Sequence, residues 1–329
     1  MTKPELMFHL QHTPLKKLQQ MADKVRQNWV GNKVYLRAII EFSNYCCRSC
    51  LYCGLRKENK RLKRYRLAPD SIIQLAQNII SKYGIKTIVL QSGDDFAYDT
   101  ETISFIIQKI KQKADVAITL SLGERDFTEF EAWRRAGADR YLMKHETANP
   151  HLYARLHPGK TLNQRLKALK QLQALGYEVG LGCMVGLPGQ TLDDLAEDIL
   201  LIRDFPADMA GIGPFIPQEE TPLSQHPAGD LSLTLKVIAL TRITSQNVHL
   251  PVTTALVTLD QNGGLEALLA GANVIMPDFT PLTYSQQYKI YNNKAKITLE
   301  FAQALTKQAG RKLNKEKGGS LKCKTLPKD

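Results

Sequence analysis

Four cysteines lie within eight positions of this chain, in the stretch CCRSCLYC at residues 46–53. Thiolate sulfur is a soft ligand that suits zinc, copper and iron–sulfur clusters, so thiols this close in a reduced protein tend to bind a metal. The alternative is a buried group of cysteines without a metal. The spacing therefore predicts a metal or redox centre rather than disulfides.

One grouping of these cysteines resembles the start of a ferredoxin motif. Cys47, Cys50 and Cys53 have the spacing C-x2-C-x2-C. A bacterial ferredoxin motif needs a fourth cysteine three residues further on, followed by proline. Lys57 and Glu58 stand there instead, so this grouping does not complete a ferredoxin cluster.

The other grouping leaves room for catalysis. Cys46, Cys50 and Cys53 have the spacing C-x3-C-x2-C, and three thiolates on a four-iron cluster leave one iron without a protein ligand. An open coordination position is what a catalytic metal site requires. A structural zinc site would need a second ligand pair, but Cys183 and Cys323 are single and far apart.

Composition and charge limit the size of the core, the cellular location and the kinds of partner that we expect. The chain has 329 residues and is 43% hydrophobic, which is enough for one large core. No apolar run has membrane-spanning length and the N-terminus lacks a signal-peptide core, so we expect a cytoplasmic protein without a membrane partner. The net charge of +12 fits an acidic protein or an anionic ligand. Nucleic acid is not the expected partner, because no RNA-binding motif accompanies the charge.

The hydrophobic pattern alternates between strands and helices eight times. Strands are expected at 35–42, 86–91, 115–121, 139–144, 177–185, 208–213, 250–256 and 272–277. Helices are expected at 69–83, 101–113, 161–175, 191–204 and 231–245. This alternation predicts an α/β fold, a complete (βα)8 TIM-type barrel, with a doubly wound open sheet as the alternative. We expect an N-terminal helical extension over 1–33, the barrel over 34–310 and a basic C-terminal tail over 311–329.

Polar and glycine-rich motifs follow the predicted strands. The cysteine motif comes directly after the first strand, and the later strands end in QSGDD, SLGE, KHETANP, MVGLPGQT and GIGPFIPQEETP. The carboxyl ends of barrel strands form one rim, where the active sites of such folds lie. The sequence therefore predicts that these motifs meet around one site.

These residues resemble the radical S-adenosylmethionine (SAM) superfamily, whose motif is C-x3-C-x2-C with an aromatic residue before the last cysteine. Within it, EFSNYCCRSCLYCGLR, AGADRYLMKHETANP and MVGLPGQTLDDL are similar to the family of the FeFe-hydrogenase maturase HydE. The resemblance runs from about residue 20 to about residue 290. It implies one 4Fe–4S cluster, SAM as cosubstrate, and reductive cleavage of SAM to a 5′-deoxyadenosyl radical.

The resemblance also implies roles for individual residues. The cluster ligands would be Cys46, Cys50 and Cys53. The residues that bind SAM would be Tyr52, Ser92, Gly93, Asp94, Ser121, Glu146 and Arg165. The implied substrate is a small anionic species, a cysteine-bound iron carbonyl–cyanide unit. The implied partners are other hydrogenase maturases and a reductant such as ferredoxin or flavodoxin.

Two departures from the family pattern matter. Lys144 stands where the family usually has arginine, and lysine cannot make the same bidentate contact with an anion. Family members with a second cluster carry three cysteines near the C-terminus, whereas this chain has only Cys323 there, so no second cluster is expected. Lone His145 is interpreted as a packing residue.

Three alternatives stay open. Biotin synthase would need cysteines on barrel strands for a second cluster, and Thr119 and Gly180 occupy two such positions. Methylornithine synthase also has one cluster, but it lacks the sequence motifs HETANP and VGLPGQT. An iron–sulfur electron carrier would need neither a 300-residue barrel nor a rim shaped for SAM.

Overall fold

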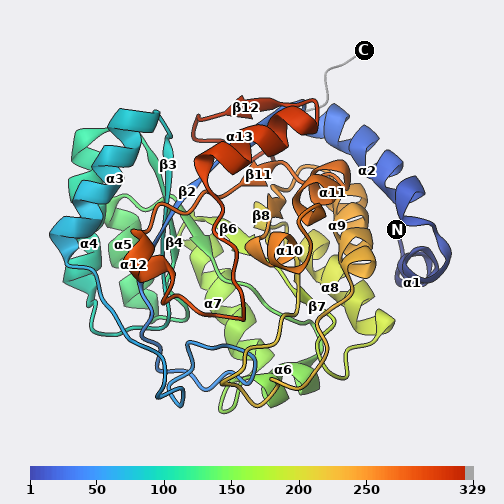
Figure 1. Ribbon diagram of the computed structural model, residues 1–329, viewed down its shortest axis with the longest axis horizontal. Coiled ribbons are helices and arrows are strands. Elements are labelled where there is room, and N and C mark those ends of the chain that lie inside the picture. The colour runs from blue at the N-terminus through green and yellow to red at the C-terminus, as the bar shows by residue number, and fades with distance from the viewer. Residues whose placement is uncertain (323–329) are drawn as a thin grey trace.

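Parallel strands surrounded by helices make up the part of the chain that the computed structural model describes, residues 1–322 (Figure 1). The helices are α1 (Lys3–His12), α2 (Leu15–Trp29), α3 (Pro69–Tyr83), α4 (Thr100–Lys113), α5 (Phe127–Ala136), α6 (Pro150–Leu156), α7 (Leu162–Ala174), α8 (Leu192–Asp204), α9 (Leu231–Ser245), α10 (Thr254–Leu259), α11 (Gly263–Leu269), α12 (Leu282–Ser285) and α13 (Leu299–Gln308). The strands are β1 (Lys33–Leu36), β2 (Ala38–Ser43), β3 (Thr87–Ser92), β4 (Ala117–Ser121), β5 (Arg140–Leu142), β6 (Glu178–Leu181), β7 (Met184–Val185), β8 (Met209–Ala210), β9 (Gly213–Pro214), β10 (Pro251–Val252), β11 (Val274–Ile275) and β12 (Lys312–Asn314).

Each strand segment expected from the sequence contains at least one strand. The first of them is divided at Arg37, because β1 pairs with β11 and β12 while β2 pairs with β3. The fifth and sixth segments are likewise divided, into β6 with β7 and β8 with β9. Strand β12 lies in the stretch that was expected to be a tail.

All paired strands run parallel, in the orders β10-β11-β1-β12, β2-β3-β4-β5-β6-β8 and β7-β9. The first two groups are joined along the chain at Arg37. Two isolated parallel bridges, Met209 with His249 and Ile39 with Asp278, lie between strands of these two groups. These features show an α/β fold with a parallel sheet, which brings the carboxyl ends of the strands to one side.

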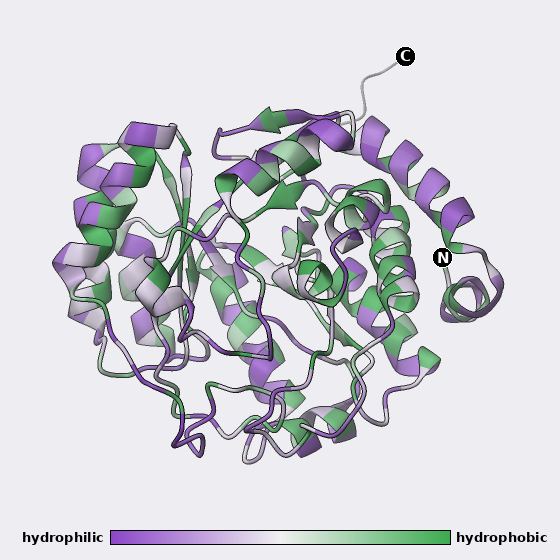
Figure 2. Ribbon diagram, viewed as in Figure 1, coloured by the Kyte–Doolittle hydropathy of each residue, from purple (hydrophilic) through white to green (hydrophobic). Residues whose placement is uncertain are grey.

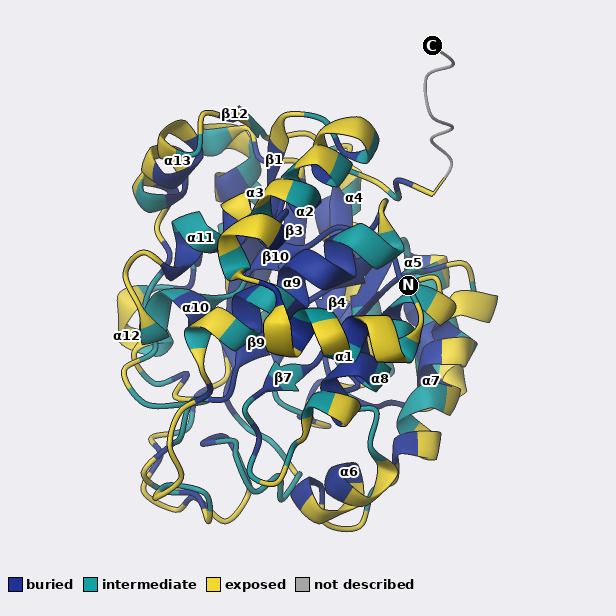
Figure 3. Cartoon of the chain, turned by 90° about the vertical axis from the view of Figure 1, so that its right-hand side faces the viewer, coloured by how far each residue is buried: buried dark blue, intermediate teal, exposed yellow. Residues whose placement is uncertain are grey.

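The core lies between the strands and the surrounding helices. Buried side chains on β2 to β4 are mostly aliphatic, and the bulky Trp133, Phe130 and Tyr141 fill the space under α5. Figure 2 shows hydrophobic residues along the strands and a mostly hydrophilic α2. Figure 3 shows buried strands behind helices whose outer faces are exposed. Burial of such side chains contributes about 1.5–3 kcal/mol each, which makes this core the main stabilising feature of the fold.

Side-chain caps fix where several helices begin. Helix α7 starts with a reciprocal capping box between Thr161 and Gln164, and α8 starts with one between Thr191 and Asp194. Each box satisfies backbone N–H groups that a helix start would otherwise leave unpaired. Thr191 thus caps α8 and fixes the end of the loop that follows β7.

The N-terminal helices pack on the outside of the fold. Helix α1 contacts α8, and α2 contacts α9, along one edge of the molecule (Figure 1). Among residues 1–322, none of the helices combines the length and apolar character needed to cross a membrane. The expected division of the chain at residues 33 and 310 stays a prediction.

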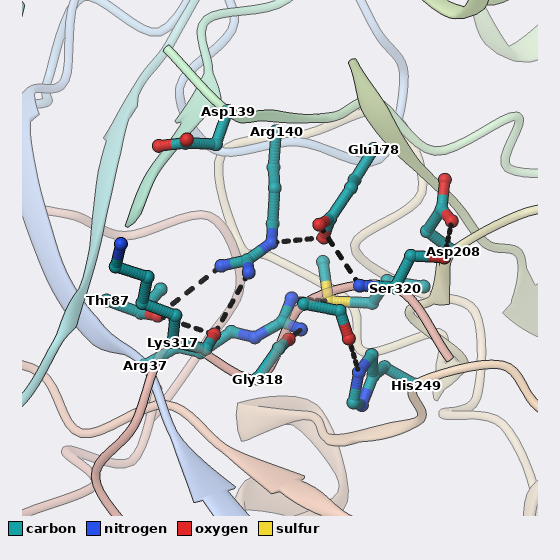
Figure 4. A network of polar contacts seen from close by, with 12 residues as sticks. Arg37, Thr87, Asp139, Arg140, Glu178, Asp208, His249, Lys317, Gly318 and Ser320 are labelled. Atoms are coloured by element: carbon teal, nitrogen blue, oxygen red, sulfur yellow. Dashed lines mark hydrogen bonds and ion pairs between the residues drawn. The ribbon is translucent and has the colours of Figure 1, made fainter. Parts of the chain in front are cut away.

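The segment after β12 lies against the amino-terminal ends of the strands (Figure 4). Its backbone carbonyls accept hydrogen bonds from Arg140 (to Lys317 O, 3.0 Å) and Arg37 (to Gly318 O, 3.3 Å). Ser320 donates to Asp208 (2.6 Å). Residues 312–322 of the expected basic tail are therefore held by hydrogen bonds to the strands, while Cys323 lies outside the described residues.

Candidate active site

A cavity of about 320 Å³ opens among the loops that follow the carboxyl ends of the strands. Every residue that the sequence assigned to the cluster or to SAM lines it: Cys46, Tyr52, Cys50, Cys53, Ser92, Gly93, Asp94, Ser121, Glu146 and Arg165. The structure thus brings together residues from the loops after β2, β3, β4 and β5 and from α7. Their individual roles stay predictions.

The four clustered cysteines divide between the two sides of one loop. Cys46, Cys50 and Cys53 line the cavity, whereas Cys47 is exposed and lines a different hollow. Burial raises the pKa of Cys46 to about 12 and that of Cys53 to about 11. Three cysteines that line one cavity are a donor set that fits an iron–sulfur cluster, because soft metals bind such thiols in the deprotonated form.

Backbone contacts hold the cysteine loop against the strand ends. The Cys47 amide donates to the Asp94 carbonyl (3.1 Å), and the Gly54 amide donates to the Ile290 carbonyl (2.9 Å). A side chain at Gly93 could not be accommodated, because its Cβ would lie 2.3 Å from the Tyr45 carbonyl oxygen. The absence of a side chain at Gly93 therefore lets the loop after β3 approach the cysteine loop closely.

A chain of charged groups crosses one wall of the cavity. The Arg48 guanidinium contacts Asp94 (2.5 Å). Arg165 donates to Glu124 (2.7 Å) and to the Lys144 carbonyl (2.9 Å), and Lys160 also binds Glu124 (2.9 Å). Burial raises the pKa of Glu124, but the two cations outweigh it and hold that pKa below its usual range. The ion pair with Glu124 fixes the orientation of Arg165 at the cavity wall.

Glu146 combines two unusual features. Its backbone is left-handed, with φ of 65°, and one carboxylate oxygen, Oε2, is buried without a hydrogen-bond partner among the described residues. Such a backbone costs about 1–3 kcal/mol, and a buried unpaired oxygen adds to that cost. Glu146 therefore fits a ligand that donates hydrogen bonds into the cavity, as the hydroxyls of a ribose would.

Two buried residues hold the Glu146 loop: His145, which was interpreted as a packing residue, and Asp198, which the sequence did not indicate. His145 Nδ1 accepts from the Gly182 amide (3.4 Å), so its Nε2 is left to donate to Asp198 Oδ1 (3.1 Å). Asp198, on α8, also accepts from the Ala148 amide (2.5 Å) and from Gln190 (3.4 Å). Burial raises the pKa of Asp198, although the hydrogen bond from His145 opposes that shift. The one sequence signal for Asp198 is its position on the buried face of α8. It belongs to no motif with His145, because the two residues are far apart in the sequence.

His145 and Asp198 also lie near Cys183, with one potential ligand atom of each within 4.8 Å of the others. All three residues are buried. The histidine and the aspartate already hydrogen-bond to each other, and burial raises the pKa of Cys183 well above its ordinary value. We interpret this group as a hydrogen-bonded packing site rather than a metal centre.

The rest of the cavity wall is mostly aromatic and apolar, with Lys144 and Gln91 as polar members. Tyr52 is held by a hydrogen bond between its hydroxyl and His157 Nε2 (2.9 Å). Lys144 lines the cavity in the place where the sequence suggested an anion-binding residue. The remaining lining includes Met184, Phe215, Ile216, Tyr288, Ile290 and Tyr291. Such a wall surrounds the cation of Lys144 with largely apolar side chains.

Comparisons with known proteins give one family match and several relatives. Residues 40–202 match the family model described as the radical SAM superfamily. The chain is 52% identical over 275 residues to the FeFe-hydrogenase maturase subunit HydE of Thermotoga maritima, which covers 84% of this chain and 78% of that protein. It is 29% identical over 263 residues to 3-methylornithine synthase of Methanosarcina acetivorans, covering 79% and 74%. The crystal structure of methylornithine synthase superposes with a TM-score of 0.82 at 25% identity, covering 95% of this chain and 94% of that one.

Proposed function

Because the chain belongs to the family of radical SAM enzymes that contains the FeFe-hydrogenase maturase subunit HydE, we propose that it reductively cleaves SAM in the maturation of the organometallic cofactor of FeFe-hydrogenase. The single observation that carries this proposal is the identity to HydE over most of both chains. The cavity supports it, because three cysteines and the polar residues expected to bind SAM line the same space.

In this proposal, one 4Fe–4S cluster is held by Cys46, Cys50 and Cys53. When bound, the cluster and SAM supply a 5′-deoxyadenosyl radical, which takes a hydrogen atom from the substrate. Three protein ligands would leave one coordination position for SAM, and a fourth protein ligand would block it. Cys47, on the other side of the loop, leaves that position free.

The remaining residues would bind and orient SAM. The backbone of Ser92, Gly93 and Asp94 would accept hydrogen bonds from the amino group. Arg165 would pair with the carboxylate, since a guanidinium already oriented by Glu124 loses little freedom on binding. Glu146 would accept hydrogen bonds from the ribose hydroxyls through its unpaired oxygen.

Three further residues or features complete the proposal. Tyr52 would lie near the adenine, and Ser121 would contact SAM from the end of β4. The strands would close as a complete (βα)8 barrel through the bridges beside β8 and β11. A closed barrel would keep water and competing hydrogen donors away from the radical.

We propose a small anionic substrate, a cysteine-bound iron carbonyl–cyanide species, with Lys144 as the group that meets its charge. Other hydrogenase maturases and an electron carrier would be its protein partners. A cytoplasmic location also belongs to the proposal, because free thiols need a reducing compartment.

Methylornithine synthase is the second candidate, favoured by the match of the two folds over nearly their whole lengths. Turnover separates the two functions. The reconstituted protein would be incubated without oxygen with SAM, dithionite and either a cysteine-bound iron complex or lysine. Consumption of the iron complex supports the maturase, whereas conversion of lysine to methylornithine would assign the chain to the second function.

A further inference from the structure

A second hollow, of about 200 Å³, lies on the outer side of the cysteine loop. We call it the outer groove; it is lined by residues 47–50, Lys57, Glu124, residues 157–160 and Arg165. Of the three cysteines proposed to hold the cluster, Cys50 alone lines both this groove and the inner cavity. Cys50 is therefore the ligand at which the cluster comes nearest to the outer groove.

Backbone hydrogen bonds and one stacked pair of rings fix the walls of the outer groove. The Lys57 amide donates to the Arg48 carbonyl (2.9 Å), which folds the loop back on itself. On the facing wall, the Lys160 amide donates to the His157 carbonyl (2.9 Å), and the His157 ring stacks on Tyr153 at 4.1 Å. Such a surface is formed before a partner arrives, so binding would cost little ordering of the loops.

A wider hollow of about 400 Å³ adjoins the outer groove and shares Arg48, Glu124 and Lys160 with it. Two phenylalanines line it with their side chains partly in solvent, Phe96 at 53% exposure and Phe127 at 42%. Aromatic side chains are common at the centres of protein interfaces. The two hollows thus form a continuous surface with apolar anchors beside the cysteine loop.

The charge of this surface is positive. Its cations are Arg48, Lys57, Arg125, Lys160, Arg165 and Lys167, against the acids Glu124 and Asp126. Four of these cations are engaged in ion pairs with Asp94, Glu129 or Glu124. Within residues 1–322, Lys57 and Lys167 are exposed and make no ion pair. These two lysines are free to meet the charge of a partner.

We propose that the outer groove and the adjoining hollow form the docking site for an acidic one-electron carrier protein of the flavodoxin or ferredoxin type, which passes its electron inward at Cys50. This inference rests on the proposed function, because it needs a cluster on the inner side of Cys50. The carrier is oxidised by one electron and the cluster is reduced by one, so no further reactant is required. The surface suits such a partner, because electron-transfer complexes are small and electrostatically steered.

The test compares two double variants that change the net charge equally. Lys57→Glu with Lys167→Glu reverses the two unpaired charges of the proposed site. Lys33→Glu with Lys307→Glu is the matched control, because both lysines are exposed and lie toward the amino-terminal ends of the strands, away from the cysteine loop. Binding of a flavodoxin of net negative charge is measured by titration calorimetry at low and at high salt, and SAM cleavage is measured with flavodoxin or with dithionite.

The site variant should raise the Kd for flavodoxin at least about tenfold at low salt, with a smaller effect at high salt where charges are screened. The control variant should bind flavodoxin with the Kd of the wild type. With dithionite as the reductant, both variants should cleave SAM at the same rate. Equal flavodoxin binding by the two variants would overturn the docking site. The same would follow if single-stranded nucleic acid bound the wild type more tightly than flavodoxin and lost that binding in the site variant. Failure of the wild type to cleave SAM with dithionite would instead refute the proposed function.

Discussion

Replacement of Asp198 by asparagine is expected to weaken SAM binding although Asp198 does not line the cavity. Its carboxylate receives hydrogen bonds from His145 (3.1 Å), the Ala148 amide (2.5 Å) and Gln190 (3.4 Å). These contacts surround Glu146, whose left-handed backbone would relax without them. Asparagine keeps the size of the side chain, removes the charge, and adds an NH2 group that cannot accept from Gln190.

The magnitude follows from these contacts. Hydrogen bonds to a charged group contribute about 1.5–3 kcal/mol and those between neutral groups about 0.5–1.5 kcal/mol, so two weakened bonds lose about 2 kcal/mol. The strain at Glu146, about 1–3 kcal/mol, is of similar size. The loop would therefore leave its observed conformation in a large fraction of molecules. We expect the free energy of unfolding to fall by about 2 kcal/mol and the Kd for SAM to rise about tenfold.

Three measurements on one preparation test this reasoning. Iron content should stay at that of the wild type, because the cysteine loop makes no hydrogen bond to Asp198 among the described residues. SAM affinity and thermal unfolding should both change. Asp204→Asn is the matched control, since Asp204 is exposed on the same helix. Wild-type SAM affinity in the Asp198 variant, together with reduced stability, would show that Asp198 supports the fold and does not position Glu146.

Three further predictions follow from the site and the fold. Cys46→Ala should lose most of the iron and all SAM cleavage, whereas Cys47→Ala should keep four irons per chain and stay active; the opposite pattern would mean that Cys47 is the ligand. Arg165→Ala should raise the Kd for SAM about tenfold or more with the cluster retained, since an unpaired carboxylate costs about 1–3 kcal/mol; an unchanged titration would remove Arg165 from the site. Truncation after Lys315 should lower the free energy of unfolding by about 3 kcal/mol, because buried Arg37 and Arg140 lose hydrogen-bond partners; an unchanged melting temperature would contradict the role given to that segment.

The sequence predicted α3, α4, α7, α8, α9 and most strands well, because their local signals agree with the fold, whereas α5, α6 and α10 to α13 were not among the expected helices. Helices α3 and α9 have the bounds expected from their apolar period, and α7 and α8 begin at the polar residues that cap them. Strand β12 was missed, because three residues in a lysine-rich stretch carry no strand pattern. Its pairing with β1 is a long-range contact that local reasoning cannot detect.

For the candidate site, too, the sequence predicted some residues and missed others. Nine of the ten assigned residues lie on one cavity because they belong to motifs at the ends of strands, and parallel strands bring those ends together, while Arg165 reaches the same cavity from α7. Asp198 was missed, since a single acid on a helix has no spacing that marks it, and Glu124 was given no role of its own although it ends the motif SLGE. His145 was interpreted as packing, and it is buried, but its hydrogen bond to Asp198 also links it to the site.

The most direct test of the central claim is the formation of 5′-deoxyadenosine. The protein would be reconstituted with iron and sulfide without oxygen, and given SAM and dithionite, beside a Cys46→Ala control treated in the same way. The account predicts 5′-deoxyadenosine and methionine in equal amounts from the wild type and none above background from the control. No 5′-deoxyadenosine from a wild-type preparation that holds four irons per chain would contradict it.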